Sequence, residues 1–583
     1  MSRTDLSPER RRADRARLPD EVVDVVVIGG GVTGAGAALD AASRGLSVAV
    51  LEARDWAAGT SSRSSKLIHG GLRYLEQFAF PLVHEALHER ARLVQTIAPH
   101  LVTPLPFLLP LTAPVWQRAY YGAGVALYDV LGAALAADRG IPTHRHLSRR
   151  ATLEAFPALR GDAVHGAIRY WDAQVDDARH TLAVVRTAAG YGARALSSAR
   201  VTGLLREGGG PQSPVVGVRV ADLTDGSSFP VRARSVIAAT GVWSDDVGAM
   251  LGVEAPSLRV RASKGVHLVV PRSAIAGNEI QPTGLILRTP TSVLFVIPWG
   301  DHWIVGTTDT PWRLDRAHPA ASSADIDYLL GQLNQVLTRP VTAADIVGVY
   351  AGLRPLLAGE ADQTSRLSRE HAVVTPVPGL VLVAGGKYTT YRVMAKDAVD
   401  AAVHALPWKV PKSCTDTVPI IGGDGFQAAW NQRQARADRA GIHVAWVEHL
   451  LRRYGTLTDE LLDLVREKPE LGEPLEGAPE YLRVEAYYAA LAEGALHLDD
   501  ILTRRTRISI ETFDRGQSSA RHVAELVAPV LGWDQPTIDD EVTHYLARVE
   551  AELQSQKEPD DQTADAARLG APEVRRLGAE RTP

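Results

Sequence analysis

Apolar runs near the start of the chain alternate with a segment of strong helix formers. Residues 22–28 form an apolar, largely β-branched run, residues 35–44 are rich in alanine, and residues 46–51 are apolar again. Runs of this length on either side of a helix-forming segment predict a strand, a helix and a second strand. Gly45 stands where such a helix would end. The pattern therefore predicts a βαβ unit at the start of an α/β domain.

The turn between the first strand and the helix reads Gly-Gly-Gly-Val-Thr-Gly over residues 29–34. In a dinucleotide-binding unit Gly29 permits the sharp turn, Gly31 lets a pyrophosphate approach the backbone, and Gly34 lets helix and strand pack closely. The helix N-terminus offers free N–H groups and partial positive charge to the phosphates. Glu52 ends the second strand, where its carboxylate can accept both ribose hydroxyls and would repel a 2′-phosphate. The unit therefore predicts a bound dinucleotide, either FAD or NAD.

Strand-like segments much further along the chain complete the same domain. Residues 228–239 predict a strand followed by Thr-Gly at Gly241, an ending typical of FAD-binding folds and not expected of a domain that binds NAD alone. Residues 380–384 predict the last strand, and Gly385-Gly386 then opens a helix from about Thr389. A helix that begins there aims further N–H groups at the cofactor. These segments favour FAD over NAD.

A group of strands and a group of helices predict two further parts. Strand-like runs lie at residues 258–270, 285–287, 292–298 and 302–306. The last two face each other across a turn at Gly300-Asp301, which predicts an antiparallel sheet forming a roof over a substrate site. Residues 426–555 have helical periodicity, and Arg504, Arg505 and Arg507 are expected on a solvated helix face. We therefore expect an α/β FAD-binding Rossmann-like domain with an inserted, mainly antiparallel β-sheet substrate domain, plus a C-terminal all-α domain.

The predicted domain boundaries follow changes in composition. Residues 1–20 carry six arginines and are expected to be a disordered basic extension. Residues 411–425 are rich in Pro, Gly and Asp and predict a linker, whereas the polar residues 556–583 predict a disordered tail. The FAD-binding domain is expected at residues 21–410, interleaved with a cap at roughly 80–165 and 255–355.

The composition narrows the class of protein. A chain of 583 residues is too long for one core, and its net charge of −5 gives no basic field that would attract nucleic acid. Cys414 is the only cysteine, so any redox chemistry must belong to a bound cofactor. The sequence has no His/Cys cluster at metal-ligand spacing and no apolar run of membrane-spanning length, and its first 19 residues lack the apolar core of a secretory signal.

Several widely spaced motifs form a specific combination. Residues 60–74 read Thr-Ser-Ser-Arg-Ser-Ser-Lys-Leu-Ile-His-Gly-Gly-Leu-Arg-Tyr, and residues 385–392 read Gly-Gly-Lys-Tyr-Thr-Thr-Tyr-Arg. Lys264-Gly-Val-His267 and Gly352-Leu-Arg354 lie between them. The combination resembles the FAD-dependent glycerol-3-phosphate dehydrogenase family. The resemblance implies oxidation of sn-glycerol 3-phosphate to dihydroxyacetone phosphate, by hydride transfer from C2 to flavin N5, with electrons passed to membrane quinone.

The resemblance also implies roles for individual residues. The expected FAD contacts are Gly29, Gly31, Gly34, Glu52, Thr60, Ser61, Ser62, Lys66, Leu67, Val201 (near adenine), Gly241, Gly385 and Gly386. The expected substrate contacts are Arg73, Tyr74, Arg369 and Thr389, and the expected catalytic residues are His267, Arg354 and Lys387. His267 either takes the alcohol proton or is a half-buried strand histidine, and His69 is a lesser candidate for the base. Arg354 could stabilise the alkoxide, while Lys387 could support charge at flavin N1–C2=O or hold substrate.

Three other functions stay open at this point. An oxidase would pass the electrons from the same substrate to O₂. An amine or amino-acid oxidase of the same FAD superfamily would need one carboxylate clamp, whereas this chain has several candidate cations for a phosphate dianion. A flavin-bound scaffold would bind partners through its helical domain without turnover.

Residues 101–135 are apolar and rich in aromatic side chains. A helix is predicted over residues 115–137, with Trp116, Tyr120, Tyr121 and Tyr128 as aromatic anchors. Such a helix is either a buried core or dimer-interface segment, or it lies in a membrane interface. The family resemblance favours the membrane. We therefore expect a cytoplasmic protein peripherally associated with the inner face of the cytoplasmic membrane. If the segment does not contact the membrane, the alternative is that it forms a homodimer interface.

Overall fold

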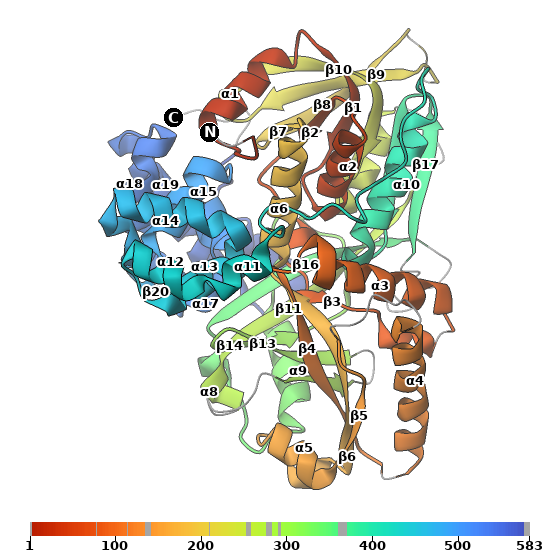
Figure 1. Cartoon of the computed structure of the whole chain (residues 1–583), viewed down its shortest axis with the longest axis vertical. Coiled ribbons are helices and arrows are strands. Elements are labelled where there is room, and N and C mark those ends of the chain that lie inside the picture. Colours follow the sequence, from red (N-terminus) through yellow and green to blue (C-terminus); the bar gives the residue numbers. More distant parts are fainter. Residues whose placement is uncertain are drawn as a thin grey trace.

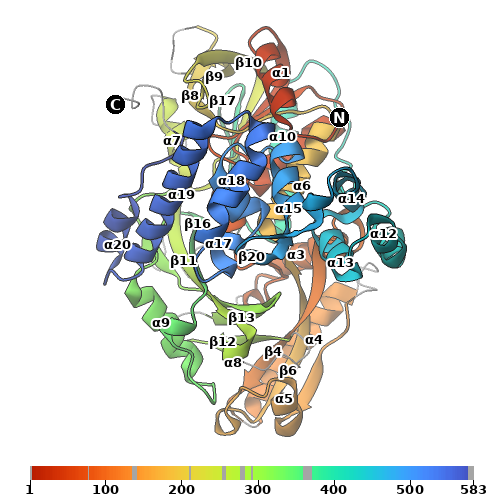
Figure 2. The same ribbon diagram turned by 90° about the vertical axis from the view of Figure 1, so that its left-hand side faces the viewer.

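The computed structural model describes residues 3–76, 78–113, 115–133, 141–208, 210, 212–251, 258–275, 283–289, 293–358 and 370–575. It has three parts (Figure 1, Figure 2): an α/β part built on a first sheet, sheet A, a second part built on sheet B, and a helical C-terminal part that packs beside both. Within the described ranges, no helix has the length and apolar character needed to cross a membrane.

Sheet A has the strand order β17-β18-β10-β1-β2-β7, and β8 and β9 extend it from β10. Its strands are β1 (Val22–Ile28), β2 (Val48–Leu51), β7 (Arg194–Leu196), β8 (Ala199–Arg206), β9 (Val215–Asp222), β10 (Ser228–Ala238), β17 (His371–Val377) and β18 (Leu380–Gly385). Strand β1 is parallel to β2 and β10, and β10 is parallel to β18. The carboxyl ends of these parallel strands meet at one edge, which is where such sheets bind ligands.

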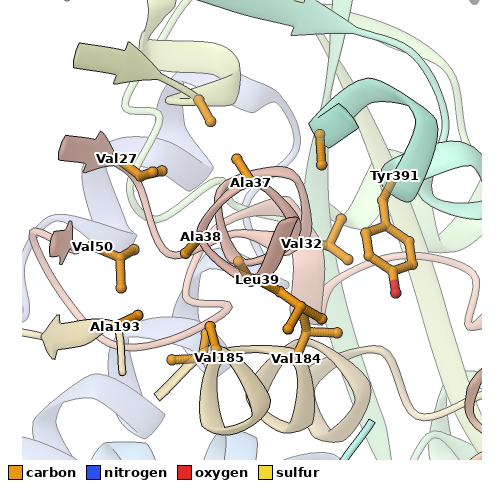
Figure 3. Packing of buried hydrophobic residues seen from close by; sticks show 14 of the residues in the cluster. Val27, Val32, Ala37, Ala38, Leu39, Val50, Val184, Val185, Ala193 and Tyr391 are labelled. Atoms are coloured by element: carbon orange, nitrogen blue, oxygen red, sulfur yellow. The ribbon is translucent and has the colours of Figure 1, made fainter. Parts of the chain in front are cut away.

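Helix α2 (Val32–Ser43) packs on one face of sheet A (Figure 3). Val27 and Val50 of the sheet lie on one side of the helix. Val184 and Val185 of α6 (Asp177–Gly190) and Tyr391 of α10 (Tyr391–Val403) lie on its other sides. Because α2 is rich in alanine and glycine, its neighbours can approach the helix axis closely. The predicted βαβ unit is confirmed.

Sheet B has the order β15-β11-β14-β13-β12-β4-β6-β3, with β16 on β11 and β5 on β6. Its strands are β3 (Leu67–Ile68), β4 (Val102–Leu111), β5 (Arg145–Ser148), β6 (Gly166–Val175), β11 (Val260–Pro271), β12 (Gly284–Arg288), β13 (Val293–Trp299), β14 (His302–Gly306), β15 (Thr310–Trp312) and β16 (Gly348–Leu357). Its helices are α3 (Phe80–Arg92), α4 (Trp116–Ala133), α5 (Arg149–Ala155), α8 (Arg272–Ile275) and α9 (Ser323–Asn334). Apart from β12 beside β4, neighbouring strands are antiparallel, as predicted.

The C-terminal part is helical and includes one short hairpin of β19 (Pro474–Leu475) and β20 (Ala478–Leu482). Its helices are α11 (Phe426–Asn431), α12 (Arg433–Ala440), α13 (Val444–Tyr454), α14 (Thr458–Glu467), α15 (Arg483–Ala492), α16 (Leu498–Asp500), α17 (Ile508–Glu511), α18 (Gln517–Leu531), α19 (Gln535–Ser555) and α20 (Asp561–Arg568). Their apolar faces enclose separate clusters of buried leucine, valine, alanine and tyrosine side chains. The predicted fold class is confirmed.

The prediction that residues 1–20 are disordered is wrong for the described residues. Helix α1 (Pro8–Arg17) begins at Ser7, whose Oγ accepts a hydrogen bond from the Arg10 N–H at 3.3 Å. Arg11 forms an ion pair of 2.8 Å with Asp222, and Leu18 is fully buried. Arg11 and Arg15 therefore pair with one acid more than two hundred residues away, which composition alone does not reveal.

The predicted disorder of residues 556–583 is also wrong as far as Arg575. Asp560 caps helix α20 by accepting hydrogen bonds from two backbone N–H groups, and Ala564 of that helix is fully buried. Arg575 lies 2.6 Å from the carboxylate of Asp500 and is itself buried. Residues 576–583 lie outside the described part of the chain. Polar side chains of residues 556–575 form hydrogen bonds and ion pairs with the rest of the molecule, and these contacts hold the segment in one conformation.

Candidate active site

A cavity of about 640 Å³ lies where the carboxyl edge of sheet A meets sheet B. Sheet A contributes the glycine turn after β1, Glu52 after β2 and the segment after β10. Sheet B contributes His267 from β11 and Arg354 from β16. Ligand cavities of several hundred cubic ångströms with a few converging polar groups are typical of cofactor sites. The cavity therefore joins the predicted dinucleotide end to the predicted catalytic residues.

The glycine turn permits close approach at each of its three predicted positions. Gly29 has a φ of +109°, and a methyl group there would lie 2.6 Å from the carbonyl oxygen of Ala239. A methyl group at Gly34 would lie 2.0 Å from the carbonyl oxygen of Gly29, so only glycine lets α2 start this close to β1. At Gly31 a methyl group would project toward Ser61, whose Oγ would be 3.2 Å away. The turn thus presents bare backbone and a helix N-terminus to the cavity.

Glu52 is held in place by backbone donors. Its carboxylate accepts hydrogen bonds from the N–H groups of Gly30, at 2.6 Å, and Arg54, at 2.7 Å. Burial raises the pKa of Glu52, and the two hydrogen bonds oppose that rise. The carboxylate therefore has a fixed orientation at the end of β2, where a ribose would be bound in this kind of fold.

Most of the predicted FAD contacts line the cavity. These are Gly29, Gly31, Glu52, Thr60, Ser61, Leu67, Val201, Gly241, Gly385 and Gly386. Gly34, Ser62 and Lys66 are not among the lining residues. The Lys66 ammonium is buried and lies 2.8 Å from the Asp177 carboxylate and 3.1 Å from the carbonyl oxygen of Ser62. The expectation that Lys66 contacts the cofactor is corrected, because an acid on α6 draws the side chain away from the cavity.

The same acid fixes the serine-rich loop. Asp177 accepts hydrogen bonds from the backbone N–H of Ser64, at 2.9 Å, and from its Oγ, at 2.7 Å. Arg507 of the helical part donates to Asp177 at 2.6 Å and to the carbonyl oxygen of Ser62 at 3.3 Å. The loop that lines the cavity is therefore held by α6 and by the C-terminal part together.

The prediction of a solvated face for Arg504, Arg505 and Arg507 is wrong. All three side chains are buried. Arg505 makes two hydrogen bonds of 2.7 Å to the carboxylate of Asp55, and Arg504 donates to the same carboxylate at 2.5 Å. A planar guanidinium can form such paired hydrogen bonds with a carboxylate. Asp55 and Asp177 were visible in the sequence, but their separation of more than three hundred residues from these arginines gave no pairing signal.

His267 is a buried imidazole at the cavity wall. Its ring stacks on Tyr350 at a centroid distance of 4.7 Å, and its Nε2 lies 2.9 Å from the Oγ of Ser65. Nδ1 has no hydrogen-bond partner among the residues that the structure describes. Burial, with added repulsion from Arg354 and Lys66, lowers the pKa of His267 well below its usual value. The imidazole is therefore neutral near pH 7 and can accept a proton.

Arg354 and Lys387 place cations on the cavity wall. The Arg354 guanidinium donates to the Oγ1 of Thr307 at 3.1 Å and to the carbonyl oxygen of Thr308 at 3.2 Å. The Lys387 ammonium lies 3.8 Å from the ring centre of Tyr74, and both residues line the cavity. Arg354, Lys387 and Tyr74 thus all line the same cavity, and Lys387 and Tyr74 lie next to each other.

The remaining predicted substrate residues have different positions. Thr389 is buried away from the cavity, and its Oγ1 pairs with the backbone N–H and C=O of His69 at 3.1 and 3.2 Å. His69 itself lines the cavity. Arg73 lies in a short helical turn, Leu72–Leu75, with its side chain outside the described part of the chain, as is the whole of Arg369. Thr389 therefore supports His69 by a hydrogen-bonded bridge.

Two arginines that the sequence analysis passed over also line the cavity, Arg54 and Arg63. Burial, with added repulsion from Arg54, lowers the pKa of Arg63 to about 9. Arg54 follows Glu52 by two residues, and Arg63 lies inside the serine-rich motif. Their positions beside predicted cofactor residues were the only signal available, since sequence does not show which way a side chain points.

Two family models match the chain. The model described as FAD dependent oxidoreductase matches residues 24–400. The model described as the C-terminal domain of alpha-glycerophosphate oxidase matches residues 413–538. The two matches follow one another along the chain and cover the α/β part, sheet B and most of the helical part.

Curated relatives and one solved structure extend this similarity over nearly the whole chain. Glycerol-3-phosphate dehydrogenase 2 from Mycobacterium tuberculosis is 57% identical over 570 residues, which is 98% of this chain and 95% of that protein. The mitochondrial glycerol-3-phosphate dehydrogenase of Homo sapiens is 37% identical over 532 residues, 88% of this chain and 71% of that protein. The structure of the glycerol-3-phosphate dehydrogenase from Bacillus halodurans complexed with FAD is 28% identical, with a TM-score of 0.76 over 95% of this chain and 99% of that one.

Proposed function

Because the chain belongs to the FAD-dependent glycerol-3-phosphate dehydrogenase family, we propose that its cavity oxidises sn-glycerol 3-phosphate to dihydroxyacetone phosphate and that the electrons pass to a membrane quinone. The observation that carries the proposal is one cavity that joins a dinucleotide turn to a neutral histidine and two cations. The redox step needs a hydride acceptor, which FAD supplies when bound. The chain itself must bind, orient and deprotonate the alcohol.

The lining residues fit FAD. The bare backbone of Gly29 and Gly31 and the N-terminus of α2 suit a pyrophosphate, because N–H groups and the helix dipole favour negative charge there. Glu52 suits a ribose, and Val201 on β8 suits the adenine end. Gly385, the last residue of β18, and Gly386 also line the cavity and directly precede Lys387.

We assign the proton transfer to His267. Ser65 lines the cavity, and its Oγ lies 2.9 Å from Nε2, so the alcohol proton can reach Nε2 through that hydroxyl. The stacked ring of Tyr350 keeps the imidazole in one orientation. A positioned general base of this kind accelerates proton transfer by about 10²–10⁴-fold.

We assign the phosphate of the substrate to Lys387, Tyr74 and Arg354. Arginine and lysine are the side chains that bind a phosphate dianion. The hydrogen bonds of Arg354 to Thr307 and Thr308 fix its guanidinium, which lowers the entropy lost on binding. Several cations around one cavity favour a phosphate over the single carboxylate of an amino acid.

Flavin bleaching tests the reaction. Glycerol 3-phosphate added to the holoenzyme without oxygen should remove the absorbance of oxidised flavin, whereas glycerol should not. If the flavin stays oxidised with glycerol 3-phosphate, the proposed function is contradicted. The protein would then be better described as a flavin-bound scaffold than as a dehydrogenase.

The electron acceptor needs its own test, because an oxidase would share the first half of the reaction. Enzyme reduced by substrate should be reoxidised rapidly by a short-chain quinone and slowly by air in a stopped-flow experiment. Rapid reoxidation by air would replace the quinone-linked reaction with an oxidase reaction.

We propose that the exposed aromatic face of α4 binds the inner face of the cytoplasmic membrane. Trp116 at the start of this helix is 61% exposed, and Val115, directly before it, is 76% exposed. Tyr120 is exposed as well, whereas Tyr128 is buried and donates to Asp172 at 2.6 Å. Exposed aromatic rings beside aliphatic groups are comfortable at the lipid headgroup level. Of the predicted aromatic anchors, Trp116 and Tyr120 therefore lie on the surface, whereas Tyr128 lies in the core.

Extraction tests the membrane proposal. The protein should leave membranes with salt plus detergent but not with salt alone, and the double variant Trp116→Ser, Tyr120→Ser should leave with salt alone while keeping its FAD. If the unaltered protein is free in the lysate and sediments as a dimer that the double variant loses, this face is a homodimer interface instead.

A further inference from the structure

The final described residues run from the helical part back to the cofactor cavity. We call residues 556–575 the strap; they follow α19, include α20 and lie beyond residue 538, where the match to the C-terminal family model ends. Figure 2 shows α20 beside the end of α19 and close to α9. The strap is therefore outside the domain that the family model describes.

The first half of the strap is tied to sheet B. Asp561 pairs with the Lys264 ammonium at 2.5 Å, and Lys264 is fully buried in β11. The backbone N–H of Ser323, the first residue of α9, donates to the carbonyl oxygen of Glu558 at 2.8 Å. Lys264 also pairs with Asp325 of α9 at 2.5 Å, so one buried ammonium joins the strap to both β11 and α9.

The second half of the strap is tied to sheet A and to the helical part. Arg575 donates to both oxygens of Asp500, at 2.6 and 2.7 Å, and to the Oγ of Ser198 at 2.9 Å. Ser198 precedes β8, whose first residues line the cavity. Arg575 therefore anchors the strap close to the adenosine end of the cavity.

Between these anchors the strap touches the loop of residues 313–320, which closes one end of the cavity. Ala317 of this loop lines the cavity, and its carbonyl oxygen accepts a hydrogen bond of 2.9 Å from Arg54. Arg316 donates to the carbonyl oxygen of Val242 at 2.9 Å and to Asp246 at 2.8 Å. Arg54, Val242 and Asp246 all line the cavity.

One pair of side chains joins the loop to the strap. Nε2 of His318 lies 2.7 Å from the Glu573 carboxylate. Arg568 of α20 approaches the other ring nitrogen, Nδ1, at 3.3 Å. Both nitrogens of His318 are therefore held by the strap, directly next to Ala317 in the chain.

We propose that the strap is part of the cofactor site: it holds the 313–320 loop against Arg54 and so slows the release of FAD. The inference rests on the proposed function in one respect, that FAD occupies the cavity. For the loop to move away, the contacts of His318 with Glu573 and Arg568 must break. A chain without those contacts opens the adenosine end more often, and FAD leaves faster.

Two truncations of the full chain separate the strap from the end of the chain. One ends after Gly570 and lacks Glu573 and Arg575; the matched control ends after Arg575 and lacks only residues 576–583. FAD fluorescence, which rises on release, should appear at least tenfold faster from the first protein than from the intact chain, and at the intact rate from the control. Equal rates from the intact chain and both truncations, or equally fast release from both truncations, would overturn the proposal.

Single substitutions distinguish the loss of the contact between loop and strap from a general loss of protein stability. Glu573→Gln and His318→Gln should each speed release at least threefold. The double variant should release FAD no faster than His318→Gln alone, because His318→Gln already removes the contact with Glu573 as well as the one with Arg568. The melting temperature of each FAD-free variant should match that of the intact FAD-free chain. Fully additive effects, or lower melting temperatures that account for the release, would reject the strap as a positioning element.

The strap and the proposed function can fail separately. If substrate does not bleach the intact holoenzyme while the truncation after Gly570 still speeds FAD release, the proposed reaction fails and the strap stands. If substrate bleaches the flavin and the release rates are equal, the reaction stands and the strap fails.

Discussion

At the scale of single residues, burial decides how the cavity handles a proton. The imidazole of His267 is buried between cations and the ring of Tyr350, which removes its charge at neutral pH. An exposed histidine would be half protonated near pH 6.5 and would lose function as a base below that value. The low pKa of His267 thus fits a base that must stay neutral beside cations that bind a dianion.

Replacing the imidazole gives the first prediction. His267→Asn should lower the rate of flavin reduction at saturating substrate by about 10²–10⁴-fold, the usual contribution of a general base. Stopped-flow absorbance of the flavin measures it. Ser65→Ala, which keeps the imidazole but removes the hydroxyl that passes the proton to Nε2, should cause a loss of similar size. An unchanged rate in His267→Asn would move the base to another residue, with His69 the next candidate.

The pH dependence of the same rate gives the second prediction. Because the pKa of His267 lies well below 6.5, the neutral form persists as the pH falls through that value. The limiting rate of flavin reduction at saturating substrate should therefore fall much less between pH 7.5 and 5.5 than the about tenfold loss that a base of pKa 6.5 would show. A tenfold loss over this range would show an ordinary histidine pKa.

At the scale of elements, local patterns in the sequence were sufficient where the element depends on near neighbours. The glycine turn, β1, α2 and β2 agree with prediction because strand length, helix formers and glycine act within thirty residues. Residues 426–555 were expected to be helical, but the break at Gln432 between α11 and α12 was not predicted, because periodicity alone does not locate it.

The serine-rich loop gives a prediction at this scale. Asp177→Asn would leave the buried Lys66 and Arg507 without their shared carboxylate and should destabilise the protein by about 3–5 kcal/mol. Urea unfolding of the holoenzyme measures the loss, and FAD affinity should fall with it because this loop lines the cavity. The exposed pair of Arg521 and Asp539 is the control, because solvent screens that pair and Asp539→Asn should leave the urea midpoint nearly unchanged. Equal losses in the two variants would refute the structural role of Asp177.

At the scale of the whole molecule, ion pairs join segments that are remote in sequence. Arg505 pairs with Asp55, Arg507 with Asp177, and Arg179 with Glu493. The sequence predicted a Rossmann-like domain, a roof sheet and a helical domain, and most of the cavity lining, because those follow from local pattern and motif. It did not predict these pairs or the ordered strap, because any of 68 acids could pair with any of 63 Lys and Arg residues until the fold brings them together.

These ion pairs between remote segments predict how the molecule unfolds. Three independent domains would unfold separately, but separation here would leave buried charges without partners. The holoenzyme should therefore show one calorimetric transition, with calorimetric and van't Hoff enthalpies in agreement. Two resolved transitions would show that the helical part and sheet A unfold independently.

Strand β4 has a consequence for how the two halves of sheet B are joined. It is an interior strand between β12 and β6, and it pairs with β6 along its whole length despite Pro104, Pro106 and Pro110. The His165 N–H donates to the carbonyl oxygen of Leu111, so the backbone groups of the odd-numbered residues of β4 point to β6. The three prolines have even numbers, so the positions that lack an N–H point to β12. Among the described residues β12 pairs with β4 only at Phe107 and Leu108, so few backbone hydrogen bonds cross this junction, and side-chain packing must hold the two halves of the sheet together there.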